Sequence, residues 1–325
     1  MLAIQATRAG GPEVLQAIDL AEPTPGPGQV RIRHQAIGVN FIDTYHRSGL
    51  YPITYPAVLG LEAAGLVEAV GEGVTRFKAG DRAAYATGPM GAYAEAHVVP
   101  ADRAVKVPQG ISLETAAGLM LKGMTAEFLI RRCHAVLSGE TILVHAAAGG
   151  VGTLLTQWAA ALGAHVIGTV GSAAKAEMAR ANGCQHVILS REEDVAARVR
   201  EITAGKGVPV VYDGVGAATF EASLTSLARR GMLVSYGNAS GPAPAIEPTR
   251  LARGGSLFLT RPTLFDYVAT TPELDASAAD VFDVVATGKV KVEIGQTFAL
   301  KDAGRAHEAL EARETSGASL LLPQA

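Results

Sequence analysis

The chain has 325 residues, of which 48% are hydrophobic and 18% charged, so it is long enough for two domains and has an ordinary globular composition. Its formal net charge of −3 gives no electrostatic attraction toward nucleic acid or an anionic membrane surface. Two cysteines, Cys133 and Cys184, cannot form a disulfide framework or a four-cysteine zinc site, so we expect a reducing, cytoplasmic setting.

The N-terminal part is predicted to be rich in β-strands. Residues 1–8 lack a long apolar segment and predict a first strand, not a signal peptide, and no apolar run in the chain is long enough to span a membrane. Further short strands are predicted at 30–33, 65–70 and 94–99, separated by turn-forming glycine and proline. This pattern favours a small barrel or sandwich that ends near residue 122.

From Leu121 onward, predicted strands alternate with helices such as 173–181 and 192–203. The strands are predicted at 141–146, 165–170, 186–189, 208–213, 232–236 and 256–260. The alternation predicts a parallel sheet, and six strands suit a doubly wound nucleotide-binding fold.

The last segment, 272–325, contains two predicted helices and two predicted strands. They lie at 274–286, 303–313, 296–300 and 319–322. Because this segment is too short for a third domain, we expect it to pack onto the first.

The first strand of the alternating region leads into the turn Ala147-Ala148-Gly149-Gly150-Val151-Gly152, after which a helix is predicted. The turn matches G-x-G-x-x-G with alanine in place of the first glycine. Glycine lets the backbone approach a pyrophosphate, and the helix N-terminus offers unpaired N–H groups and a partial positive charge. The alternative is an ordinary strand-to-helix turn. The flanking strand and helix, and a second strand about 20 residues later, favour a dinucleotide site.

The end of the second strand distinguishes between the two nicotinamide dinucleotides. An NAD site usually has an acidic residue here for the ribose hydroxyls, yet no Asp or Glu lies between Leu162 and Lys175. Ser172 is expected to cap the next helix, which would place a hydroxyl and the Lys175 cation beside a 2′-phosphate. The alternative is that Lys175 is an ordinary solvated lysine. The sequence favours NADPH.

The sequence patterns typical of several other enzyme classes are absent from the chain. No H-x-x-x-H pair, Tyr-x-x-x-Lys pair or G-x-S-x-G turn occurs in the chain. Cys184 and His186 could share one face of a strand, but no third ligand is apparent and we expect both to be packing residues. We predict no metal site.

A combination of segments spread over nearly the whole chain is highly specific. These segments are 38–45, 48–52, 60–65, 79–82, 121–125, 145–152, 211–216, 234–238, 259–262 and 317–321. With them the chain resembles the zinc-independent branch of the medium-chain dehydrogenase/reductases, specifically the NADPH:quinone oxidoreductase (zeta-crystallin-like) family. The resemblance implies an α/β protein. A GroES-like β-barrel catalytic domain would occupy 1–122 and 266–325, and a six-stranded, doubly wound Rossmann domain that binds NADPH would occupy 123–265.

The resemblance also implies site residues. Zinc-dependent relatives carry a cysteine where this chain has Asn40 and a histidine where it has Leu61, so zinc independence is implied. The Asn40 amide is implied to face the nicotinamide; the alternative is a turn residue after a strand. The residues expected to line NADPH are Asn40, Thr125, Gly149, Gly150, Val151, Gly171, Ser172, Lys175, Ser190, Gly237, Asn238, Phe258, Leu259 and Thr260. Family members often have a tyrosine where this chain has Ser190, so either Arg191 takes its place or the preference for NADPH is milder.

The implied reaction is hydride transfer from NADPH to a quinone in a cleft between the domains. Tyr45 is a candidate proton donor, with packing as its alternative role, and Arg261 is a candidate polariser of the carbonyl. Two other functions stay open: an NADPH-dependent reductase of enones or alkenals, and an NADPH-gated RNA-binding protein, against which the net charge counts. The family also implies a homodimer, joined through the apolar edge strand at 256–259.

Overall fold

The computed structural model describes residues 1–324, which divide into two units with separate sheets. Unit 1 comprises residues 1–124, 268–286 and those from 292 onward, and unit 2 comprises residues 125–267 and 287–291. The C-terminal segment therefore belongs to unit 1 apart from one short stretch, residues 287–291. Within the described residues, no helix combines the length and apolarity needed to cross a membrane.

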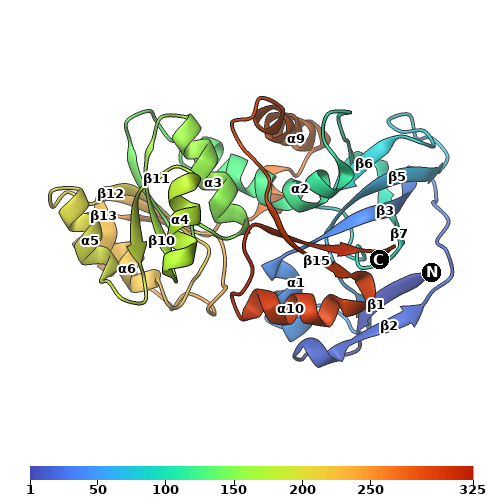
Figure 1. The fold of residues 1–325 in the computed structure, drawn as a ribbon, viewed down its shortest axis with the longest axis horizontal. Coiled ribbons are helices and arrows are strands. Elements are labelled where there is room, and N and C mark those ends of the chain that lie inside the picture. Colours follow the sequence, from blue (N-terminus) through green and yellow to red (C-terminus); the bar gives the residue numbers. More distant parts are fainter. Residues whose placement is uncertain (325) are drawn as a thin grey trace. The chain divides into compact units, whose positions relative to one another are not determined.

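Unit 1 holds two β-sheets (Figure 1). One has the strand order β2-β1-β4, and the other has the order β15-β16-β3-β5-β6-β8, with β7 also paired to β3. The strands are β1 Leu2–Ala6, β2 Leu15–Asp19, β3 Gln29–Val39, β4 Ala57–Val58, β5 Glu62–Val70, β6 Arg82–Tyr85, β7 Ala96–Pro100, β8 Val105–Lys106, β15 Ile294–Ala299 and β16 Ala318–Leu322. The helices are η1 Pro12–Val14, α1 Phe41–Ser48, η2 Ala101–Arg103, α2 Leu113–Phe128 (which begins in this unit), α9 Thr271–Ala286, η4 Leu300–Asp302 and α10 Ala303–Glu311.

The core of unit 1 forms on one face of β3. Val30 and Ile32 are completely buried, whereas the intervening Arg31 and Arg33 keep part of their side chains in solvent. This is the two-residue period of a strand with one face on the core. Each such aliphatic side chain contributes about 2 kcal/mol through its burial.

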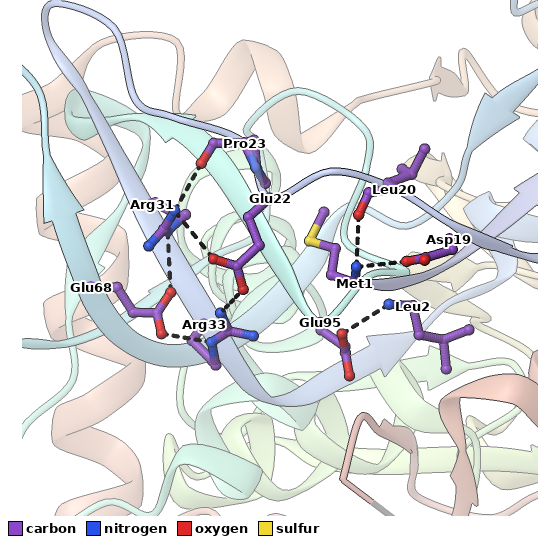
Figure 2. A network of polar contacts seen from close by, with 10 residues as sticks. All are labelled: Met1, Leu2, Asp19, Leu20, Glu22, Pro23, Arg31, Arg33, Glu68 and Glu95. Carbon is purple, nitrogen blue, oxygen red and sulfur yellow. Dashed lines mark hydrogen bonds and ion pairs between the residues drawn. The ribbon is translucent and has the colours of Figure 1, made fainter.

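The outward face of β3 carries a network of charged groups (Figure 2). Arg33 donates from Nε to Glu68 at 2.6 Å and from Nη2 to Glu22 at 2.5 Å. The Nε atom of Arg31 lies 3.1 Å from the other oxygen of Glu68. Beside this network, the N-terminal amine donates to Asp19. The carboxylates of Glu22 and Glu68 are 49% and 29% exposed, so water screens these pairs and each contributes little to stability.

Unit 2 holds one parallel sheet with the strand order β11-β10-β9-β12-β13-β14. Its strands are β9 Thr141–Val144, β10 His165–Val170, β11 Cys184–Leu189, β12 Val208–Asp213, β13 Leu227–Ser235 and β14 Phe258–Thr260. Its helices are η3 Leu129–Cys133, α3 Gly150–Ala161, α4 Ala173–Ala181, α5 Val195–Ile202, α6 Phe220–Ser226, α7 Pro248–Arg253 and α8 Leu264–Tyr267. Along the chain, strands are added on one side of β9 (β10, then β11) and then on its other side (β12, β13, β14). This order confirms the prediction of a six-stranded, doubly wound fold.

Several element ends differ from the prediction for local reasons. β9 ends at Val144 because Ala146 turns the chain with a φ of 52°, and β14 starts only at Phe258 because Ser256 has a φ of 58°. The helix predicted at 192–203 starts at Val195, since the Asp194 side chain caps it by accepting from Ala197 N at 3.0 Å. A strand or helix ends where the backbone dihedral angles of a residue fall outside the extended or helical region.

Cys184 and His186 do not share a strand face. The β10–β11 register shifts between Val166 and Ile167, which places an extra residue in β11 beside Cys184. Cys184 is buried and His186 is exposed, so the suggestion of a common face was wrong. Burial raises the pKa of the Cys184 thiol to about 11, which keeps it protonated near neutral pH.

Candidate functional site

The glycine turn after β9 is built by close backbone contacts. Gly149 caps α3, donates to Ala146 O at 2.8 Å and accepts from Thr153 N at 2.8 Å. A Cβ on Gly152 would lie only 2.2 Å from Ala146 O, so a larger residue does not fit there without a backbone shift. The turn thus brings the first N–H groups of α3 to the carboxyl edge of the sheet, the arrangement that suits a pyrophosphate.

A buried hydrogen-bond network lies directly below this turn. His145 contacts Thr169 Oγ1 through Nδ1 at 3.0 Å and Ser223 Oγ through Nε2 at 3.0 Å. Ser223 donates to Asp213 Oδ2 at 2.6 Å, and the other oxygen of Asp213 accepts from Val215 N at 2.8 Å. The network ties β9, β10, β12 and α6 together and so holds the edge of the sheet that carries the glycine turn.

A second group of predicted residues lies at the ends of β10 and β11. Ser172 caps α4, and its Oγ accepts from Lys175 N at 3.5 Å. Ser190 donates its hydroxyl to Val170 O at 3.2 Å, which holds the end of β11 beside β10. A Cβ on Gly171 would lie 3.4 Å from Arg191 Nε. The structure therefore places the Ser172 cap, Lys175 in the first turn of α4, and the Arg191 guanidinium near Gly171. No Asp or Glu occurs between Leu162 and Lys175, whereas beyond β11 the Glu193 carboxylate accepts from Leu189 N at 2.7 Å.

A third group lies beyond β13 and on β14. Gly237 follows β13 closely, and a Cβ there would lie 2.4 Å from Gly214 O, so the loops after β12 and β13 are in direct backbone contact. Asn238 accepts through its backbone carbonyl from Gly241 N at 2.9 Å. Arg261, just after β14, donates to Pro262 O at 3.1 Å. The members of this group on β14 itself are Phe258, which is 56% exposed, Leu259 and Thr260, which are half-buried.

Thr125 stands apart from these groups along the chain. It is a buried residue of α2. Its role in binding stays a prediction.

In unit 1, the predicted residue Asn40 is held by two buried carboxylates. Asn40 is the N-cap of α1 and forms a capping box with Asp43, whose Oδ2 accepts from Asn40 N at 2.8 Å. The Asn40 amide donates from Nδ2 to Glu62 Oε2 at 2.8 Å. Glu62 is fully buried and also accepts from Leu121 N at 2.7 Å and from Lys122 Nζ at 3.3 Å. The backbone and the amide of Asn40 therefore both have buried partners, and its role at the nicotinamide stays a prediction.

The Asp43 carboxylate ends a directed chain of hydrogen bonds. Arg47 can only donate, so its 3.2 Å contact makes His307 Nδ1 an acceptor and leaves the ring proton on Nε2. His307 Nε2 lies 2.9 Å from Tyr93 OH, which donates to Asp43 Oδ2 at 3.0 Å. Burial nevertheless raises the pKa of Asp43 to about 7, and burial lowers the pKa of His307 to about 3.

Tyr45 lies one turn further along α1 in an aromatic cluster. It is 8% exposed, and its ring packs edge-on against Tyr51 with centroids 5.1 Å apart. The ring of Phe41 is also a neighbour, with its centroid 6.3 Å from that of Tyr45. The structure gives Tyr45 a packing role, and a chemical role for its hydroxyl stays a prediction.

Leu61, at the position of a zinc-ligand histidine in the zinc-dependent relatives, is 4% exposed and packs as an apolar residue. Among residues 1–324, no group of three or more His, Cys, Asp or Glu side chains could hold a metal ion.

Comparisons with known proteins agree over the whole chain. Residues 26–109 match the alcohol dehydrogenase GroES-like domain, and residues 150–280 match a domain described as a zinc-binding dehydrogenase. A quinone oxidoreductase of Pseudomonas aeruginosa is 53% identical over 321 residues, 98% of this chain and 99% of that protein. The chain belongs to the quinone oxidoreductase family. Its membership makes it an oxidoreductase and confirms the resemblance seen in the sequence.

Two further members of the medium-chain dehydrogenase/reductases bear on this family's chemistry. The structure of Escherichia coli quinone oxidoreductase complexed with NADPH is 48% identical, with a TM-score of 0.98 over 99% of this chain and 100% of that chain. A 2-haloacrylate reductase of a Burkholderia species is 46% identical over 325 residues, 98% of each protein. The GroES-like and Rossmann fold class is thereby confirmed.

Sequence reasoning did not identify the buried charged residues around Asn40. Glu62, Lys122 and Asp43 lie in segments that carried the resemblance, but their side chains were given no role. The only signal in the sequence was that charged residues occur inside otherwise apolar segments, such as Gly60-Leu61-Glu62-Ala63-Ala64. Charges in such places need buried partners, and only the fold shows which residues these are.

Proposed function

We propose that this protein is an NADPH-dependent quinone reductase. The observation that carries the cofactor choice is the end of β10, where no Asp or Glu occurs between Leu162 and Lys175, Ser172 caps α4 and the Arg191 guanidinium lies beside Gly171. An acidic residue at this place would repel a 2′-phosphate, whereas a hydroxyl and two cations suit one. The choice of a quinone is supported by relatives of about 50% identity that are named quinone oxidoreductases, and by an NADPH complex of one of them.

The residues at the sheet edge fit such a dinucleotide. Gly149, Gly150 and Val151 would hold the pyrophosphate at the N-terminus of α3, in a turn whose close backbone contact with Ala146 depends on the missing Cβ of Gly152. Ser172 and Lys175 would hold the 2′-phosphate, with Arg191 in place of the tyrosine that relatives often have. The remaining residues that we propose around the cofactor are Asn40, Thr125, Gly171, Ser190, Gly237, Asn238, Phe258, Leu259 and Thr260.

Bound NADPH supplies a hydride, which together with one proton converts a quinone to a hydroquinone and leaves NADP⁺. The protein's contribution is to orient the reactants and to exclude water. A quinone accepts a hydride without a Lewis acid, so we propose that the reaction is zinc-independent, in keeping with Asn40 and Leu61 at two positions where zinc-dependent relatives have ligands. Water or the Tyr45 hydroxyl would supply the proton, and Arg261 would polarise the carbonyl.

We further propose a cytoplasmic homodimer with a catalytic domain at 1–122 and 266–325 and a cofactor domain at 123–265. The support for a dimer is the edge strand β14, which pairs with β13 on one side and carries the half-exposed Phe258. An edge strand with apolar side chains is a ready pairing surface. We expect light scattering to give twice the mass of the chain, and a monomer would contradict the proposal.

Steady-state oxidation of NADPH tests the activity directly. We expect turnover with 1,4-benzoquinone and naphthoquinone, and much slower turnover with an alkenal or with 2-chloroacrylate. The same assays with NADH show how strict the cofactor choice is. Absence of quinone turnover would refute the proposal, and faster reduction of the alkenal or of 2-chloroacrylate would reassign the substrate class.

A further inference from the structure

Glu62 is an unusually placed carboxylate. Its side chain is completely buried, yet it accepts hydrogen bonds from the Asn40 amide, from Leu121 N and from the ammonium of Lys122, whose side chain is 7% exposed. Gly38 makes room for it, because a Cβ at that position would lie 2.2 Å from Glu62 Oε2. The fold therefore accommodates a buried ion pair at the side chain that we assign to the nicotinamide.

Stability alone is a poor explanation for this ion pair. Removing two charges from water is costly, and apolar side chains of similar volume are often at least as stabilising as a buried pair. The pair does have a specific geometric effect on its neighbour. Glu62, paired with Lys122, presents only lone pairs, so the amide of Asn40 has to turn its Nδ2 toward Glu62 and its Oδ1 away.

An asparagine amide can otherwise flip, since its oxygen and nitrogen ends are nearly equal in shape. The capping box with Asp43 engages the Asn40 backbone N–H and the acceptor end of its side chain, and Glu62 engages the donor end, Nδ2. We propose that Glu62 is a positioning residue, which holds the Asn40 amide in the single orientation that the nicotinamide of the bound cofactor requires. This inference rests on the proposed function through the role of Asn40.

The orientation can be measured without turnover. The chain has only three asparagines, Asn40, Asn182 and Asn238, so selective ¹⁵N labelling of asparagine gives three side-chain amide pairs, and Asn40→Ala identifies its own. We expect Glu62→Gln to move the Asn40 pair and to speed the exchange of its protons, with the other two pairs unchanged. An unmoved Asn40 pair would overturn the inference.

The kinetic test is a double-mutant cycle on NADPH turnover with benzoquinone. We expect Glu62→Gln to lower kcat/KM for NADPH about tenfold, the factor that corresponds to one lost hydrogen bond to a charged group. Binding of 2′,5′-ADP, which probes only the adenosine end, should stay unchanged. In the Asn40→Ala background, Glu62→Gln should cost nothing further, because a positioning residue acts only through the residue that it positions.

A matched control separates positioning from the general cost of breaking a buried ion pair. Glu127, whose side chain is 4% exposed, pairs with Arg132 at 2.7 Å, and Glu127→Gln should leave kcat/KM unchanged. Equal losses in Glu62→Gln and Glu127→Gln, or a full additional loss in the Asn40→Ala background, would overturn the inference.

A second variant covers the case in which Glu62→Gln does not fold. Asn40→Asp faces Glu62 with another carboxylate, so we expect it to lose more turnover than Asn40→Ala, although aspartate is closer in shape to asparagine. The opposite order would contradict the inference. Full turnover by Asn40→Ala would instead refute the proposed role of Asn40 at the nicotinamide, and the amide resonances would still decide whether Glu62 orients it.

Discussion

Asp43 should make the stability of unit 1 depend on pH in a direction that is unusual for an aspartate. Burial raises its pKa to about 7 from the ordinary 3.8, although Asn40 N and Tyr93 OH both donate to it. The folded protein therefore holds this proton up to near pH 7, whereas the unfolded chain releases it near pH 4. Between these values the folded state binds more protons, so the free energy of unfolding falls as the pH rises. From pH 5 to pH 8 the loss from this one group amounts to about 2–3 kcal/mol.

The matched variant is Asp43→Asn, which keeps the shape and an acceptor oxygen but does not titrate. Native-state hydrogen exchange followed by mass spectrometry gives opening free energies for peptides from β3 and β5, with peptides from unit 2 as the internal reference. Tryptophan fluorescence would not serve, because the single tryptophan, Trp158, lies in unit 2.

We expect the β3 and β5 peptides of the natural protein to lose about 2–3 kcal/mol more than those of Asp43→Asn between pH 5 and pH 8. His34 and His307, whose pKa values burial lowers to about 3, are present in both proteins, so their contributions cancel in the comparison. Equal slopes in the two proteins, or a steeper fall in the variant, would refute the assignment of a raised pKa to Asp43.

Four further predictions concern the site and the surface. Gly152→Ala should abolish measurable NADPH binding in a fluorescence titration, because its methyl group would lie 2.2 Å from Ala146 O; unchanged affinity would show that the turn adapts. Lys175→Glu should weaken NADPH binding far more than NADH binding, and equal losses would make Lys175 a bystander. Turnover should survive prolonged chelation, whereas stoichiometric zinc in elemental analysis would contradict zinc independence. Arg33→Ala should lower the free energy of unfolding by at most about 1 kcal/mol, with a smaller effect at high salt; a loss of several kcal/mol would mean that its partly exposed pairs are not screened.

The features that could be predicted are those written in neighbouring residues. The glycine turn after β9, the six parallel strands and the Ser172 cap each depend on a short pattern of apolar, glycine or hydroxyl residues. The structure contains all three, with strand ends that shifted where a residue such as Ser256 has a positive φ. Local patterns fix local geometry because the interactions that they describe are themselves local.

The features that could not be predicted depend on contacts between distant segments. Glu62 reaches Asn40 because β3 pairs with β5, and it reaches Lys122 because the middle of α2 lies against the end of β5. Arg191 comes beside Gly171 only through the pairing of β10 and β11. No spacing in the sequence encodes either contact, since register and helix placement are set by the packing of the whole unit.

The position of β16 between β15 and β3 has a consequence for the order in which the protein folds during synthesis. Residues 37–39 of β3 pair with β16, so this end of β3 lacks its second partner until the ribosome has made all of unit 2, although β7 pairs with residues 29–33 earlier. The sheet of unit 2, by contrast, is built from one continuous stretch, β9 to β14, and can close as soon as that stretch has emerged. The sheet of unit 1 is therefore completed last, and in the interval residues 37–39 of β3 present a short unpaired edge.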